Sequence, residues 1–279
     1  MNWKTIGLMI ISTFAFAIVN TIIKYMDEYS EFQLVFFRSA VSLIITLIQL
    51  SLLKINPLGV NRPILLLRGF SGLVALIMMY VLIKNVSLGT AVMLQYLSPI
   101  FTAIIAVFLL KERISIKQWL YLLLCVVGVA ILKSEDMNLS FQMLLLGLGS
   151  AALSGLAYNC VRISKETDHP LVAVFYFPFV GTPVALGLTF LLSEWITPSW
   201  KDMGLILILG LFTQVAQVSM TKALHSDKAA NVAVFKYLGV IHAFVIGWFI
   251  FKEPMSLNTI VGIGVILTGI ILFSKYKKA

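Results

Sequence analysis

The chain has 279 residues, of which 60% are hydrophobic and only 12% charged, and its mean hydropathy is +0.99. A soluble domain carries about 25% charged residues, so this composition excludes a soluble protein. The net charge of +9 comes from cations in short loops between apolar blocks. That distribution favours orientation charges and lipid headgroup contacts over a nucleic-acid partner.

The apolar residues come in blocks of about 20, the helix length that crosses about 30 Å of hydrocarbon. Because lipid offers no partner to unpaired backbone groups, we expect each block to be a helix. The N-terminal residues 1–17 resemble a signal peptide, but the segment has a repeat partner and we expect it to be retained. The predicted spans are 5–24, 32–53, 64–84, 88–110, 117–133, 141–161, 170–192, 203–223, 229–251 and 256–275.

Lysines and arginines set the direction of these spans. Of the 21 cations, two lie within spans and five lie on the side opposite the termini, which leaves 14 on the side of the termini. The two are Arg38 and Lys236, and the five are Lys24, Lys84, Lys133, Lys201 and Lys252. This bias predicts that both termini are cytoplasmic. We expect a multi-pass protein of the plasma membrane, and of the inner membrane in a bacterium.

The chain repeats itself. The segment "AVMLQYLSPIFTAIIAVFLLKERIS" (91–115) aligns without gaps on "VAVFKYLGVIHAFVIGWFIFKEPMS" (232–256). A shared "YL" and a shared "KE" fall at one register. Each half holds five predicted spans, and an odd number forces the second half to enter the membrane upside down. The sequence therefore predicts an all-α membrane protein of ten helices in two inverted five-helix repeats, 5–133 and 141–275.

The same segments carry a family resemblance. "LQYLSPIFTAIIAVFLLKERIS" (94–115) resembles the signature of the EamA family within the drug/metabolite transporter superfamily, with a proline early in the fourth span and a glutamate closing it. "FQLVFFRSA" (32–40) and "RGFSGLVALIMMYVLIKNVSLGTA" (68–91) are similar to the family's second and third spans. The resemblance implies helices around a central cavity that opens to one side at a time. The second half departs from it at Gly239–Val240, where the first has Ser98–Pro99.

Two cations lie deep in predicted spans. Lys236 and Arg38 lie about 10 Å from a membrane face, where an ionisable group costs about 2.5–3.5 kcal/mol on insertion scales. Either they face a water-filled cavity or they snorkel to the headgroups. We expect Arg68, nearer the end of its span, to be an interfacial charge. The pairs Lys111–Glu112 and Lys252–Glu253 are expected to cap helix ends.

All twelve acidic residues fall in or beside loops. No carboxylate within a span can therefore pair with Lys236 or Arg38, or carry a coupling proton. The counter-ion is expected to arrive with the substrate, as a carboxylate or a phosphate. Exchange of cationic drugs against protons is disfavoured.

Uncharged polar residues complete the candidate site, although each could instead make an interhelical hydrogen bond. In the fourth span they precede Pro99, which removes a backbone donor and can kink the helix. Gln214 and Gln217 share one face of the eighth span, and a lone His242 is expected to be a packing residue. The candidate substrate-binding residues are Lys236, Arg38, Gln95, Tyr96, Ser98, Tyr237, Asn20 and Asn159.

These features predict a secondary transporter that moves small metabolites by alternating access. Amino acids or other carboxylate-bearing amphipathic compounds are the expected substrates, with export favoured over import. The alternatives are an uptake or exchange carrier for S-adenosylmethionine or a phosphorylated metabolite and, in another class, a membrane scaffold. We find no enzyme constellation and expect no metal or cofactor. The expected partners are the lipid bilayer and the substrate, with a monomer or homodimer.

Overall fold

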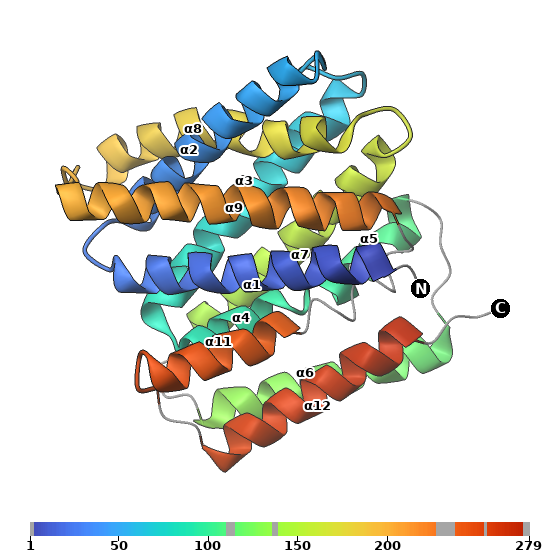
Figure 1. Ribbon diagram of the computed structural model, residues 1–279. Coiled ribbons are helices and arrows are strands. Elements are labelled where there is room, and N and C mark those ends of the chain that lie inside the picture. The colour runs from blue at the N-terminus through green and yellow to red at the C-terminus, as the bar shows by residue number, and fades with distance from the viewer. Residues whose placement is uncertain (1–2, 110–114, 136–138, 227–237, 254–255, 276–279) are drawn as a thin grey trace.

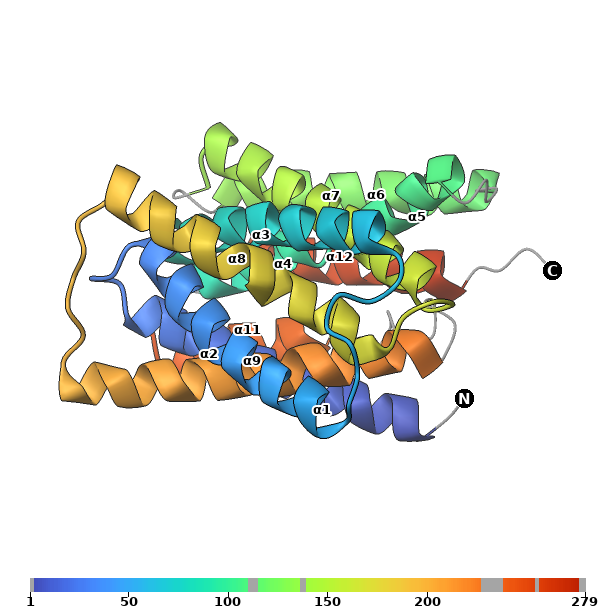
Figure 2. The ribbon, with the colours of Figure 1, turned by 90° about the horizontal axis from the view of Figure 1, so that it is seen from above.

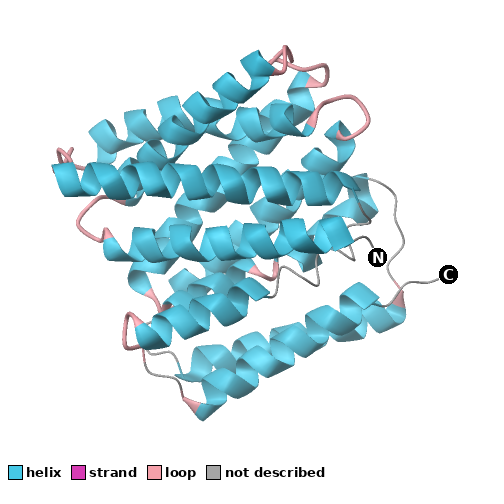
Figure 3. Cartoon of the chain, in the orientation of Figure 1, coloured by secondary structure: helices cyan, strands magenta, loops and turns pink. Residues whose placement is uncertain are grey.

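The computed structural model of the protein describes residues 3–109, 115–135, 139–226, 238–253 and 256–275. Within these ranges the secondary structure is entirely helical (Figure 3). The helices lie roughly along one direction, and the start of α1 and the end of α12 lie at the same end of the bundle (Figures 1 and 2). The helices are α1 (Trp3–Tyr25), α2 (Glu31–Leu52), α3 (Arg62–Asn85), α4 (Leu88–Gln95), α5 (Ser98–Leu109), α6 (Ile116–Glu135), α7 (Phe141–Ser164), α8 (Pro170–Leu192), α9 (Trp200–Ser226), α11 (Leu238–Phe249) and α12 (Leu257–Lys275).

Seven segments of the described chain are long and apolar enough to cross a membrane. They match the predicted spans within a few residues at each end. Two shorter apolar segments, Trp119–Gly128 and Ile260–Gly269, fall within α6 and α12. The ninth predicted span begins in residues that the structure does not describe, and its described part is α11. The long segments are Thr5–Tyr25, Glu31–Leu52, Arg62–Asn85, Leu88–Leu109, Phe141–Ser164, Pro170–Leu192 and Trp200–His225.

The fourth apolar segment is divided into two helices. α4 ends at Gln95, and α5 begins at Ser98. Pro99 lies in the first turn of α5, where it has no N–H to donate and where its ring would clash with the carbonyl of Gln95 in a continuous helix. The backbone turns more tightly at the junction, because Leu97 N donates to Leu94 O at 3.1 Å.

Helix contacts occur in matching pairs. α3 packs on α7 and α1 packs on α9; α3 also contacts α8, and α2 contacts α9. Likewise, α5 contacts α7 and α11 contacts α1. α2 packs on α8, and α6 packs on α12 at one edge of the bundle (Figure 1). In chain order, α1, α2, α3, α5 and α6 of the first half correspond to α7, α8, α9, α11 and α12 of the second half. Exchanging each helix for its counterpart leaves this set of contacts unchanged.

The contact between α6 and α12 repeats itself residue by residue. A Cβ on Gly128 would lie 2.5 Å from Ile266, and a Cβ on Gly269 would lie 2.6 Å from Cys125 Sγ. Gly128 and Gly269 occupy matching positions in the register that aligns the two repeated segments, and so do Cys125 and Ile266. The two helices therefore approach each other closely at two equivalent points, each of which requires a glycine.

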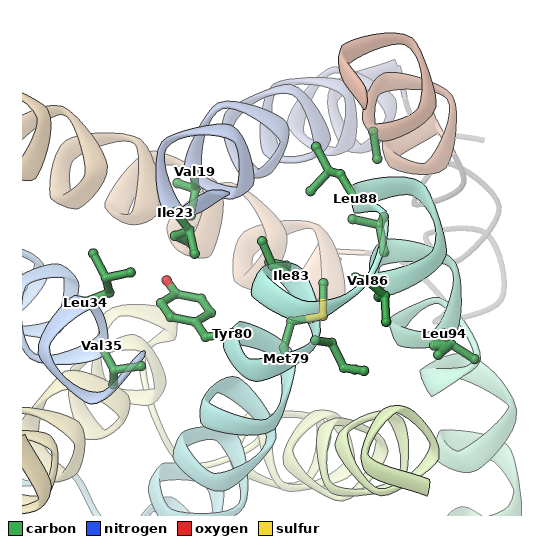
Figure 4. Packing of buried hydrophobic residues seen from close by; sticks show 14 of the residues in the cluster. Val19, Ile23, Leu34, Val35, Met79, Tyr80, Ile83, Val86, Leu88 and Leu94 are labelled. Atoms are coloured by element: carbon green, nitrogen blue, oxygen red, sulfur yellow. The ribbon is translucent and has the colours of Figure 1, made fainter. Parts of the chain in front are cut away.

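Buried apolar side chains from the first three helices meet at Tyr80 of α3. Figure 4 shows its ring facing Val19 and Ile23 of α1 and Leu34 and Val35 of α2. Tyr80 is fully buried. This packing fixes its hydroxyl group beside the cavity described next.

Candidate substrate-binding cavity

A cavity lies between helices of the two halves of the chain. It contains about 950 Å³ of space free of protein atoms, its mouth included. The first half contributes α1 to α5, and the second half contributes α7, α8 and α9. The lining residues are Met9, Ser12, Thr13, Phe16, Asn20, Arg38, Arg68, Gly72, Leu76, Met79, Tyr80, Val92, Gln95, Tyr96, Ser98, Ser154, Ala157, Tyr158, Phe177, Gln217 and Met220.

Arg38 of α2 reaches this cavity and is only 3% exposed. Its Nη1 donates a hydrogen bond to the Tyr80 hydroxyl at 2.9 Å. Its guanidinium carbon lies 5.5 Å from the ring centre of Phe177 on α8. The Nε of Arg38 has no hydrogen-bond partner among the described residues. A buried guanidinium therefore faces the cavity.

Arg68 of α3 also faces the cavity, and the expectation that it is an interfacial charge is wrong. The residue is 5% exposed, and its guanidinium carbon lies 5.1 Å from the ring centre of Phe177. Its Nη2 lies 3.4 Å from Oε1 of Gln217, a long hydrogen bond, and its Nε has no described partner. The side chain turns inward because Gly72, one turn later, leaves room beside it: a Cβ there would lie 2.6 Å from Nη1 of Arg68.

Gln95, at the end of α4, is tied to α7. Its Nε2 donates to Ser154 Oγ at 2.7 Å, and its Oε1 lies 2.7 Å from Ser150 Oγ. Ser150 also lies 2.7 Å from the carbonyl of Ala75 on α3. Gln95 thus lines the cavity and also holds the break between α4 and α5 against α7.

The other predicted site residues separate into three groups. Tyr96, Ser98 and Asn20 line the cavity with Gln95 and Arg38. Asn159 is fully buried away from the cavity, where its Nδ2 donates to Thr102 O at 2.9 Å and to Gly155 O at 3.1 Å. Lys236 and Tyr237 lie outside the described residues.

The two glutamines of α9 have different surroundings. Gln217 lines the cavity beside Arg68, whereas Gln214 belongs to a buried cluster with α2. The Gln214 Oε1 accepts hydrogen bonds from Ser42 Oγ at 2.7 Å and Thr46 Oγ1 at 3.1 Å. Its Nε2 donates to Gln49 Oε1 at 2.9 Å. Gln214 therefore joins helices, and Gln217 is the residue that a substrate could reach.

The electrostatic character of the cavity is cationic. None of its described lining residues is acidic, and two of them are arginines. The sequence reasoning also missed Phe177 and Tyr80, which contact the Arg38 guanidinium. A glycine four residues after an arginine, as in "RGFSG" (68–72), is the sequence signal that could have indicated an inward-facing Arg68.

An ion pair joins several helices at one end of the bundle. Lys24 Nζ, at the end of α1, lies 2.7 Å from Oε1 of Glu253, between α11 and α12. The same lysine donates to Val86 O at 2.9 Å. Both oxygens of Glu253 accept from the backbone N–H of Leu88, at 2.9 and 3.0 Å, so Glu253 caps α4. The expectation that Glu253 caps a helix is confirmed, although the helix belongs to the other half of the chain.

This arrangement, apolar helices of membrane-spanning length around an inner cavity that contains polar and charged side chains, is typical of a membrane transporter for small molecules. The model of the EamA-like transporter family matches residues 3–134 and 141–275. The chain belongs to the EamA-like transporter family.

Individual proteins are similar over most of their length. The pseudopaline exporter CntI of Pseudomonas aeruginosa is 30% identical over 277 residues, 97% of this chain and 96% of the exporter. The S-adenosylmethionine uptake transporter of Rickettsia prowazekii is 27% identical over 91% of this chain and 87% of its own. Solute carrier family 35 member G1 of the mouse is 27% identical over 85% of this chain and 68% of its own.

The fold is also found in a solved structure. A crystal structure matches 97% of this chain and 93% of the other with a TM-score of 0.69, at 14% sequence identity.

Proposed function

We propose that this protein is a secondary transporter that exports small, carboxylate-bearing amphipathic metabolites across the plasma membrane, which in a bacterium is the inner membrane. The observation that carries the proposal is the cationic cavity between the halves. Two buried arginines face it, and no acidic residue is among its described lining residues. A buried charge without a partner is costly, and a carboxylate on the substrate would supply that partner.

Alternating access follows from an inverted repeat of ten helices, with units 5–133 and 141–275. The matched helix contacts support this symmetry, and so does the pair of contacts at Gly128 and Gly269. In an inverted repeat, the two halves can exchange conformations, which moves the opening of a central cavity from one face to the other. The start of α1 and the end of α12 lie at one end of the bundle (Figure 2), as expected if both termini are cytoplasmic.

Export is the proposed direction of transport, the one named for the relative that is 30% identical over 97% of this chain. One relative is named as an exporter and another as an uptake transporter, so the superfamily allows both directions. In the proposed orientation the Lys24–Glu253 pair lies at the outer end, where it holds α1, α4 and the α11–α12 connection together.

Uptake or exchange of S-adenosylmethionine is the second candidate function, favoured by the similarity to a transporter of that name. Its carboxylate would suit Arg38, but its sulfonium cation would meet a cavity with no acidic residue among the described lining. A phosphorylated metabolite would suit both arginines. The absence of carboxylates from the described lining also favours facilitated diffusion or substrate exchange over proton coupling through an acid.

The test is transport by the purified protein in proteoliposomes. The panel contains amino acids, dicarboxylates, S-adenosylmethionine and phosphorylated metabolites, each loaded inside or added outside. We expect carboxylate-bearing compounds to move, and Arg38→Gln and Lys236→Met to reduce their movement. A protein that moves none of these compounds, or moves S-adenosylmethionine alone, would contradict the leading proposal.

A further inference from the structure

Two buried cations share one aromatic ring in the cavity. The guanidinium carbons of Arg38 and Arg68 lie 5.5 and 5.1 Å from the ring centre of Phe177. Their separation therefore cannot exceed the sum of these two distances. The three residues come from α2, α3 and α8, so packing of both halves brings the two charges to the same part of the cavity.

Neither charge is neutralised by the part of the protein that the structure describes. The hydrogen-bond partners of the two guanidinium groups there are a tyrosine hydroxyl and a glutamine amide oxygen, both uncharged. Each Nε is buried without a described partner. Contact with the Phe177 ring stabilises each cation, but a cation–π contact does not neutralise the charge as an anion would.

Placing two like charges near each other in a membrane interior is costly, and the cost is greater when they are partly desolvated. Buried arginines are usually paired with an acidic group, and neither of these two has one among the described residues. An anionic ligand with only one charged group would satisfy one of them. A ligand with two anionic groups would satisfy both, and each guanidinium could bind its carboxylate through two parallel N–H donors.

We propose that Arg38 and Arg68 form a paired anion site, so that the transported metabolite carries two carboxylates joined by a short linker. This inference rests on the proposed transport function and narrows its substrate class. Phe177 contacts both cations and would lie beside the linker of the ligand, and Gly72 keeps the space that the Arg68 guanidinium occupies. Gln217 holds Arg68 from the α9 side.

The first test uses the full-length protein in detergent and needs no variant. The ligands are the straight-chain dicarboxylates from succinate to sebacate, each compared with its half-amide, which has the same length and one charge fewer. Binding is measured by calorimetry or by the ligand-dependent rise in melting temperature. We expect an optimum chain length, at which the dicarboxylate binds at least about tenfold more tightly than its half-amide, as the loss of one charge-assisted pair predicts.

The second test removes one cation at a time. Arg38→Gln and Arg68→Gln are each expected to reduce dicarboxylate binding to the level of the half-amide. Arg38→Lys and Arg68→Lys keep the charge and should retain part of the preference. The matched control is Arg62→Gln, which removes an arginine at the start of the same helix as Arg68, away from the cavity lining, and should leave the preference unchanged.

Three results would overturn the paired site. Half-amides could bind as tightly as dicarboxylates at every length, which would mean that water hydrates the second arginine. Alternatively, substitution of only one of the two arginines could reduce the preference for dicarboxylates over half-amides. A phosphate monoester such as ethyl phosphate could bind more tightly than every dicarboxylate, which would place both charges on one group.

Transport assays distinguish a failure of the paired anion site from a failure of the proposed transport function. Proteoliposomes that move half-amides and dicarboxylates equally well would retain the transport function and exclude the paired site. A protein that binds the optimal dicarboxylate through both arginines but moves no compound of the panel would retain the site and exclude the transport function.

Discussion

Lys24 of α1 and Glu253, between α11 and α12, form an ion pair with 2.7 Å between Nζ and Oε1. Their side chains are 18% and 14% exposed, so the pair is partly buried. The pair joins the first helix of the chain to the connection before its last helix. Glu253 also caps α4 through the Leu88 N–H.

Breaking this pair should open that end of the bundle. We expect Lys24→Met to lower stability by about 1–3 kcal/mol, less than the loss of a fully buried pair. The charge-reversed variant Lys24→Glu/Glu253→Lys should recover only part of this loss, because a lysine at position 253 cannot accept a hydrogen bond from Leu88. Thermal unfolding in detergent measures both effects. Full recovery by the reversed pair would show that the cap does not contribute.

The two glutamines of α9 should respond differently to substitution. Gln214→Leu leaves Ser42 and Thr46 without their shared acceptor, and we expect it to destabilise the protein by about 1–2 kcal/mol. Gln217→Leu removes only the long contact with Arg68, so it should change transport kinetics and leave the melting temperature nearly unchanged. Paired unfolding and transport assays test this. The opposite pattern would contradict the placement of these two side chains.

Gly72→Ala should disturb Arg68 without removing its charge. A Cβ at position 72 would lie 2.6 Å from Nη1 of Arg68 and 3.0 Å from Cδ2 of Phe177, so the guanidinium must move. We expect about tenfold weaker substrate binding, equivalent to about 1.4 kcal/mol. The matched control is Gly187→Ala on α8, where nothing lies within 4 Å of the added Cβ. Equal effects of the two substitutions would exclude a specific role for Gly72.

The two close contacts between α6 and α12 should be equally sensitive. Gly128→Val and Gly269→Val each place branched carbons against the facing helix, and we expect similar losses of about 1–3 kcal/mol. Gly264→Val on α12 is the control, because its Cβ meets nothing within 4 Å. Melting temperatures in detergent provide the comparison. A large loss at one position only would contradict the equivalence of the two contacts.

The helices of this protein could be predicted from sequence with little error. Long apolar blocks form helices in lipid, because a helix satisfies the hydrogen bonds of every backbone group within its own segment. Predicted spans such as 141–161 and 170–192 therefore match α7 and α8 closely. The division of the fourth span near Pro99 also has a local cause, since proline acts on the residues next to it.

The candidate site depended on information that a linear sequence does not contain. Arg38 was predicted to be a site residue from its depth in a span. The shallower position of Arg68 predicted an interfacial charge, which is wrong, because Gly72 and the surrounding helices set the orientation of this side chain. Depth along a helix gives the distance to the membrane face, and only packing decides whether a side chain points to lipid or to a cavity. For the same reason, sequence could not separate Gln217 from Gln214, or Asn20 from Asn159.

The sequence by itself determined the membrane class, the helices, the family and the excess of cations over acids within the predicted spans, because composition and apolar length act locally. The tertiary structure decided which cations meet. Arg38 and Arg68 lie on different helices of the first half and share Phe177, which lies in the other half. They come together because α2, α3 and α8 bury their facing sides against one another, a non-local packing that no single segment specifies.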